Sequence, residues 1–223
     1  DKLIFKLEKI INENRVKEVI IFTSCEGYDK QAEYTRFGLE FDRLFKNIDK
    51  ILTILDKVTI VVMSTFNLFS VFSYELLIKK IHNLKLKHFN TKRYWNSAII
   101  LDTSYLRFPP HMSFRILKDY ITVDYFDRWI KYMKFNSTYR SLNFYEQQNI
   151  DDVGFSTQEI EKIVRIRDIF VADYDTPKEL FIKDRVDFYN FIIEYERRRG
   201  LNCVDYYPEL EQFIKDIKNE NKL

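Results

Sequence analysis

Polar side chains follow three short apolar runs of this sequence, at the point where each run stops. The polar segments are residues 23–27, 64–67 and 102–107. Hydroxyl, carboxylate and amide groups bind ligands by donating and accepting hydrogen bonds. If the apolar runs are parallel strands, their carboxyl ends meet at one edge, where α/β proteins bind ligands. The sequence therefore predicts a functional polar rim, and the alternative is ordinary solvation of three loops.

The segments that must position this rim alternate between apolar residues at helical spacing and short, evenly apolar runs. Apolar residues at helical spacing over 3–11, 39–55 and 72–84 predict helices. Each is followed by a short, evenly apolar run, at 19–23, 59–63 and 98–101, of the kind found in buried parallel strands. This order predicts an α/β protein with a parallel sheet and helices packed on it over residues 1–121.

Residues 122–223 read as a mainly helical region. Pro109 and Pro110 exclude both helix and central strand from the loop at 107–111. A helix is predicted over 123–135, and a polar stretch covers 136–152. Ser156 and Glu159 form a capping box that starts a helix running to about residue 172. Further helices are predicted over 180–199, ended by Gly200, and after Pro208.

Three groups of residues carry a resemblance to a known family. Residues 22–27 with 31–39 resemble the fourth strand and following turn of twitch-type radical SAM proteins, which are related to the SPASM group. Residues 63–67 are similar to the fifth strand of those proteins. Residues 195–202, with 207–209 and Phe213, resemble their C-terminal signature. The resemblance covers nearly the whole chain and implies a partial (β/α)6 barrel with a helical C-terminal region.

The resemblance also implies a cofactor and the residues that hold it. Radical SAM enzymes hold a [4Fe–4S] cluster with a C-x-x-x-C-x-x-C loop, and the reduced cluster cleaves S-adenosyl-L-methionine to a radical that abstracts hydrogen from the substrate. The resemblance implies that Ser24 and Arg36 contact the amino-acid end of S-adenosylmethionine and that Asn67 approaches its ribose. Glu26 is also assigned to the cofactor site. An arginine suits a carboxylate because its planar fork donates two parallel hydrogen bonds. The alternative for Arg36 is a surface ion pair with Glu33 or Glu40.

The remaining rim residues are assigned to the substrate. They are Asp102, Tyr105, Arg107 and His111. The resemblance implies that the substrate is a peptide or protein, because SPASM relatives often modify peptides. The cluster ligands are expected before Asp1, because Cys25 and Cys203 cannot form the three-cysteine loop. The absence of an initiator methionine leads us to expect an N-terminal part of the same protein outside this chain.

Composition argues against several other classes of protein. Lysine plus arginine number 36 and aspartate plus glutamate 34, so no overall charge attracts nucleic acid. The four glycines form no phosphate-binding loop. No apolar run is long enough for a membrane span, and two distant cysteines are typical of a reducing cytoplasm. We therefore expect a cytoplasmic protein.

Other chemically capable residues have simpler explanations. The histidines at 82, 88 and 111 are too scattered for a helical metal motif, and His82 is expected to be structural. Cys25 is expected to be an inert core residue, because Glu26 beside it disfavours a thiolate.

A basic stretch with aromatic residues supports the rival hypothesis, a non-catalytic binding protein for nucleic acid or a protein partner. Its members are Lys79, Lys80, Lys85, Lys87, Lys92, Arg93, Tyr94 and Trp95. Such interleaving can bind single-stranded nucleic acid. A solvated helix face that leads into a loop is the preferred interpretation, because the overall charge is balanced.

Overall fold

Parallel strands and the helices between them organise the first half of the chain in a computed structural model, which describes residues 2–89, 97–137 and 154–220. The sheet consists of β1 (Val19–Ser24), β2 (Val58–Phe66) and β3 (Ile99–Tyr105), in that spatial order. The helices in this half are α1 (Lys2–Asn12), α2 (Asp29–Thr35), α3 (Phe41–Ile54) and α4 (Tyr74–Lys87). The predicted α/β class with a parallel sheet is confirmed.

Two strands are longer than the apolar runs that predicted them. Ser64, Thr65 and Phe66 continue β2 and pair with residues 103–105 of β3. The backbone ladder does not depend on side-chain polarity, so it extends through these hydroxyl-bearing residues. The prediction that residues 64–66 and 102–105 follow the strands as loop is therefore wrong.

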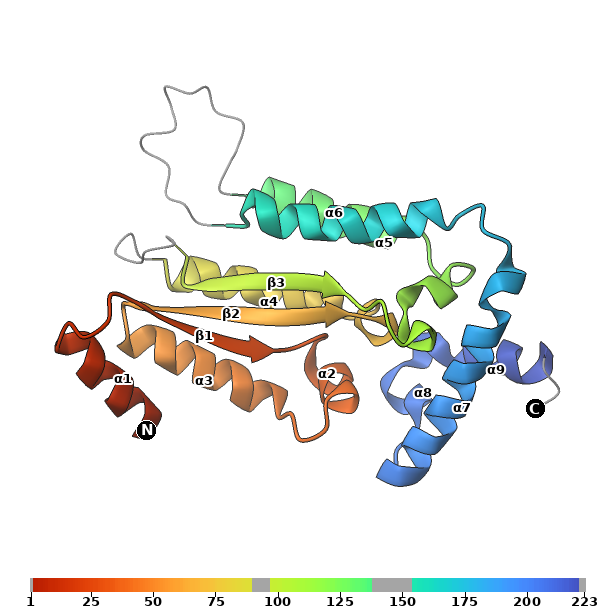
Figure 1. Ribbon diagram of the computed structural model, residues 1–223, viewed down its shortest axis with the longest axis horizontal. Coiled ribbons are helices and arrows are strands. Elements are labelled where there is room, and N and C mark those ends of the chain that lie inside the picture. The colour runs from red at the N-terminus through yellow and green to blue at the C-terminus, as the bar shows by residue number, and fades with distance from the viewer. Residues whose placement is uncertain (1, 90–96, 138–153, 221–223) are drawn as a thin grey trace, which may run out of the picture.

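The sequence also missed α2 and misjudged the environment of β1. Residues 29–35 lack an apolar period, yet they form a short helix. β1 was predicted as a buried strand, but Ile20 and Phe22 are exposed. Both side chains lie on one face of the sheet, and the helices α3 and α4 contact β2 and β3, respectively, on the other. Figure 1 shows α4 behind the strands.

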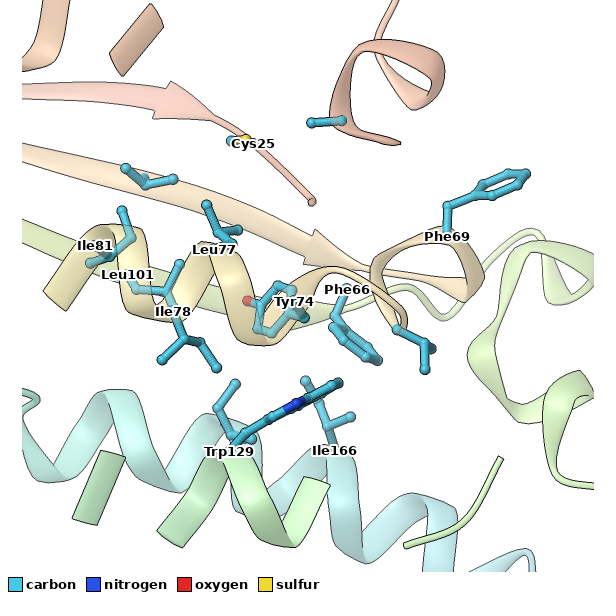
Figure 2. Packing of buried hydrophobic residues seen from close by; sticks show 14 of the residues in the cluster. Cys25, Phe66, Phe69, Tyr74, Leu77, Ile78, Ile81, Leu101, Trp129 and Ile166 are labelled. Carbon is cyan, nitrogen blue, oxygen red and sulfur yellow. The ribbon is translucent and has the colours of Figure 1, made fainter. Parts of the chain in front are cut away.

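The core fills the covered face of the sheet. Val62 and Leu101 on this face are almost completely buried. At the carboxyl end of β2, the rings of Phe66, Tyr74 and Trp129 pack edge to face or tilted, with centroids 5.0 to 5.9 Å apart. Figure 2 shows these three rings between the end of β2, the start of α4 and α5. The aromatic content of the sequence is therefore largely core packing.

The second half is helical, as predicted. It contains α5 (Asp124–Phe135), α6 (Thr157–Ala172), α7 (Ile182–Arg199), α8 (Cys203–Tyr206) and α9 (Glu211–Glu220). Short 3-10 turns stand at Leu68–Ser70, Pro110–Met112, Phe114–Leu117, Lys178–Phe181 and Pro208–Leu210. α5 and α6 lie side by side, and α6 runs along β3 (Figure 1).

The predicted start of α6 and the predicted end of α7 are confirmed. Ser156 caps α6 and forms the full capping box with Glu159. Gly200 ends α7 with φ of 63°, in the left-handed region that glycine adopts without strain. Most of the polar stretch at 136–152 lies outside the described residues. The division into two regions at residue 121 stays a prediction.

Candidate functional site

The strand register brings the ends of the three strands to one edge of the sheet. Ser24 of β1 pairs with Met63 of β2, and Met63 pairs with Asp102 of β3. In a parallel sheet, residues in register point their side chains to the same face. Ser24 and Asp102 therefore lie in one row, on either side of Met63, near the carboxyl edge.

This row belongs to a face that the described helices leave largely uncovered. We call it the open face, and its residues are Ile20, Phe22, Ser24, Thr59, Val61, Met63, Thr65, Ile100, Asp102 and Ser104. Ile20, Phe22 and Met63 are 40%, 60% and 40% exposed. Apart from the buried Thr59, whose hydroxyl donates to Glu18, apolar residues occupy the amino half of this face, and the other hydroxyl groups and the carboxylate stand toward the carboxyl edge. The arrangement provides an apolar floor that leads to a polar rim.

Arg36 and Glu26 form an ion pair just beyond β1. The Arg36 Nε and Nη2 atoms donate to the two carboxylate oxygens of Glu26, over 3.1 and 2.5 Å. The Arg36 side chain is 43% exposed and that of Glu26 10%. The hydrogen bond to Glu26 raises the pKa of Arg36, so the guanidinium is charged at any physiological pH.

The alternative partners considered for Arg36 are wrong. Glu33 accepts a hydrogen bond from the backbone N–H of Phe41, and Glu40 pairs with Arg43. Sequence spacing favoured these near neighbours, but the chain turns between β1 and α2 and brings Glu26 closer. The Arg36 Nη1 atom has no hydrogen bond within the described residues, and the guanidinium keeps one edge for a further acceptor.

Asn67 holds the turn that follows β2. Its amide nitrogen donates to the Thr65 carbonyl over 2.9 Å, and its Oδ1 accepts from the Phe69 N–H over 2.9 Å. The residue is 7% exposed. Half of the bonding capacity of the amide is therefore used within the turn, and one N–H and one lone pair remain for a ligand.

Asp102 pairs with a residue that sequence reasoning missed. Lys162 of α6 extends to Asp102, and the side chains are 38% and 40% exposed. Lys162 stands three positions after Glu159, so both lie on the helix face that contacts β3. The three-residue spacing from Glu159 was the sequence signal that could have identified Lys162. Nothing in the sequence indicated which strand this face of α6 would contact.

Tyr105 and Arg107 lie together, whereas His111 lies elsewhere. The Arg107 guanidinium lies over the Tyr105 ring, 5.1 Å from its centroid, and both residues line a cavity beyond β3. His111 packs against the ring of Phe191 in α7, with centroids 5.6 Å apart, and does not line that cavity. Of the four residues assigned to the substrate, the structure thus joins Tyr105 and Arg107 at this cavity and places His111 outside its lining.

The C-terminal segment contacts α2, the helix that directly precedes Arg36. The hydroxyl of Tyr207 donates to the Gln31 carbonyl of α2 over 2.7 Å, and the Gln31 amide donates to the Tyr206 carbonyl over 3.0 Å. The Tyr195 hydroxyl donates to the Tyr34 carbonyl. Two of the sequence regions that carry the family resemblance, separated by about 160 residues, are therefore in direct contact.

The thiols are protected. Cys25 and Cys203 are fully buried and form no disulfide. Burial raises the pKa of each thiol to about 12, and the charges of nearby Glu26 and Glu196, respectively, act in the same direction. Cys25 fits the expectation of an inert core residue.

Two of the histidines occupy structural positions. His82 is buried, hydrogen-bonds the Tyr132 hydroxyl over 2.8 Å, and has its pKa lowered by burial. His88 contacts Asp49 over 2.6 Å.

The described lysines of the basic stretch are already engaged. Lys79 pairs with Glu75, Lys87 with Asp49, and Lys85 with Glu159. Lys80 lies over the ring of Phe45, 5.5 Å from its centroid. The other four members of the stretch, Lys92, Arg93, Tyr94 and Trp95, lie outside the described residues.

Two features are absent from the described residues. These residues contain no group of three or more histidine, cysteine, aspartate or glutamate side chains placed to hold a metal ion. They also contain no helix of the length and apolarity that a membrane crossing requires. Comparison with known proteins gave the same kind of result, because no family model, no curated protein and no solved structure matches this chain.

Proposed function

We propose that this chain forms the later strands of a radical S-adenosylmethionine barrel, with the open face lining the barrel interior. The observation that carries the proposal is the sheet itself. Parallel sheets in α/β proteins are normally covered on both faces, but the described helices leave Ile20, Phe22 and Met63 exposed on one face of this sheet. The other face is apolar with a polar carboxyl edge, as expected for a surface that encloses a ligand.

The donor set at this edge fits the amino-acid end of S-adenosylmethionine. That end carries an ammonium and a carboxylate. The free edge of the Arg36 guanidinium suits the carboxylate of the cofactor, and the Glu26 carboxylate suits its ammonium. Ser24, the last residue of β1, adds a hydroxyl. Asn67 has one donor and one acceptor left for the ribose. When bound beside a reduced [4Fe–4S] cluster, S-adenosylmethionine supplies radical hydrogen abstraction.

The residues of this chain would position the cofactor and substrate and exclude water. Phe22, Val61 and Ile100 lie in one register row of the open face and provide the dry floor that radical chemistry requires. Asp102, Lys162 and Arg107 stand on the β3 side, where we place a peptide or protein substrate. The cluster ligands would come from an N-terminal part of the same protein, and two free thiols support a cytoplasmic location.

The rival hypothesis of a nucleic-acid-binding protein has less support. It requires free cations on the basic stretch, and the described lysines there are paired or lie over an aromatic ring. The sequence encoded upstream of Asp1 distinguishes the two hypotheses. A C-x-x-x-C-x-x-C loop there supports the enzyme, and its absence supports the binding protein.

The decisive experiment uses protein that includes this upstream part, reconstituted anaerobically with iron and sulfide. We expect a [4Fe–4S] absorption spectrum and reductive cleavage of S-adenosylmethionine. Arg36→Gln should weaken S-adenosylmethionine binding roughly 10-fold or more, because a charge-assisted hydrogen bond is lost, and should leave the cluster spectrum unchanged.

Arg43→Gln is the matched control. Arg43 also pairs with a glutamate, Glu40, but on the exposed surface of α3. Its replacement should leave cofactor affinity unchanged. Equal effects of the two substitutions would remove Arg36 from the site, and failure to form a cluster or to cleave S-adenosylmethionine would refute the proposed function.

A further inference from the structure

A cavity of about 330 Å³ lies beyond the carboxyl end of β3. The loop after β3 forms one wall with Tyr105, Leu106 and Arg107, and the start of α7 forms another with Phe181 and Asp184. Figure 1 shows this loop beside α7. The volume is at the lower end of the range of small-ligand pockets, which is about 300–1,000 Å³. It suits one side chain rather than a whole cofactor.

Part of the charge around the cavity is already compensated. Arg115 donates two hydrogen bonds to the carboxylate of Asp173, over 2.5 and 2.6 Å. Asp184 stands in the first turn of α7, where a negative charge offsets the helix dipole. Arg115 is therefore paired, whereas Asp184 has no hydrogen bond or ion pair within the described residues and keeps a carboxylate in the lining.

Arg107 differs from the other arginine of the cavity lining. It has no hydrogen bond or ion pair within the described residues, and its guanidinium lies over the face of the Tyr105 ring. That contact leaves the edges of the guanidinium open to acceptors, because a cation over a ring face is attracted without using its N–H groups. Among the described residues, the cavity lining therefore contains an exposed guanidinium without an ion pair, that of Arg107, together with the apolar side chains of Leu106, Ile116 and Phe181.

We propose that this cavity binds a carboxylate on a short apolar stem, namely the side chain of a glutamate or aspartate in a polypeptide substrate. Arg107 would bind the carboxylate with two N–H groups, and Leu106, Ile116 and Phe181 would enclose the methylene groups. The assignment to a substrate depends on the proposed function. The affinity for a carboxylate does not, because it follows from the cavity and the hydrogen-bond donors of Arg107.

The test is a titration of the purified 223-residue chain with three probes, followed by NMR of the arginine Nε–H groups. The probes are the α-amides of N-acetylglutamate, N-acetylglutamine and N-acetyllysine. We expect the glutamate probe to bind roughly 10-fold or more tightly than the other two, because only it carries an anion. Arg107→Gln should remove this preference.

Arg128→Gln is the matched control. Arg128 also lies over a tyrosine ring, that of Tyr125 at 5.2 Å, but does not line the cavity. Its replacement should leave binding of the glutamate probe unchanged. The titration contains no S-adenosylmethionine and no cluster, which separates this test from that of the cofactor site. Equal binding of glutamate and glutamine probes, tighter binding of the lysine probe, or an unchanged affinity in Arg107→Gln would each overturn the proposal.

Discussion

Glu159 is the side chain on which the packing of α6 against the sheet most depends. It closes the capping box by accepting from the Ser156 N–H over 2.8 Å. It also accepts from the backbone N–H of Leu101 in β3 over 2.9 Å and forms a buried ion pair with Lys85 of α4. One carboxylate therefore joins a strand and two helices. The sequence predicted its first role, but the other two depend on residues 58 and 74 positions away.

At the scale of single residues, Lys85→Met tests the buried pair. The substitution leaves the carboxylate of Glu159 in the core without its cation, so we expect the free energy of unfolding to fall by about 3–5 kcal/mol. Urea denaturation followed by circular dichroism measures the change. Lys87→Met is the control, because Lys87 pairs with Asp49 on the surface and should lose less than about 1 kcal/mol. Equal losses would show that the buried pair has no special importance.

At the scale of elements, β1 differs most from its prediction. An evenly apolar run is typical of a strand covered on both faces, and the sequence contains nothing to indicate that one face is open. β1 is also a terminal strand of the described sheet, and its second long edge faces away from β2. Such edges tend to pair with further strands. In the proposed barrel, the upstream part of the protein would pair with this edge and cover the open face.

The open face predicts unequal effects of one substitution at two apolar strand positions. Phe22→Thr should change the free energy of unfolding of this chain by less than about 1 kcal/mol, because the ring is mostly exposed and threonine is a good strand residue. Val62→Thr on the covered face should cost about 1–3 kcal/mol, because it buries a hydroxyl among apolar groups. Urea denaturation of both variants compares them. If Phe22→Thr costs as much as Val62→Thr, the face is not open in solution.

At the scale of the whole molecule, the C-terminal segment determines where α2 lies. α2 has no side-chain cap at its start and no apolar period. It is held by hydrogen bonds from Tyr207 and Gln31 and by the rings of residues 195, 206 and 207 around Tyr34. Because Arg36 follows directly after α2, the position of the candidate cofactor residue depends on the far end of the chain.

Tyr207→Phe tests this long-range support. The variant keeps the ring and loses the hydroxyl that bonds Gln31 and Thr35. A loss of about 1 kcal/mol would make local opening of α2 about fivefold more frequent, which hydrogen exchange of residues 29–35 measures by mass spectrometry. Tyr174→Phe is the control, because Tyr174 is exposed and remote from α2. Unchanged exchange in Tyr207→Phe would show that α2 is stable without this bond.

The sequence by itself determined most of the elements and several of their ends. The helices α1, α3, α4, α5, α6 and α7 and the three parallel strands follow from periodicity, and the start of α6 and the end of α7 follow from Ser156, Glu159 and Gly200. These signals act between residues a few positions apart, so they can be read directly along the chain. The clustering of the strand ends followed from the rule that parallel strands end at one edge.

Only the tertiary structure decided which charged groups meet and which surfaces stay uncovered. The partners of Arg36 and Asp102, the unpaired state of Arg107 among the described residues, and the exposure of Phe22 were not predicted. The physical reason is the same in each case. An ion pair or a covered face requires side chains brought together by the path of the whole backbone, and no local pattern in the sequence records that path.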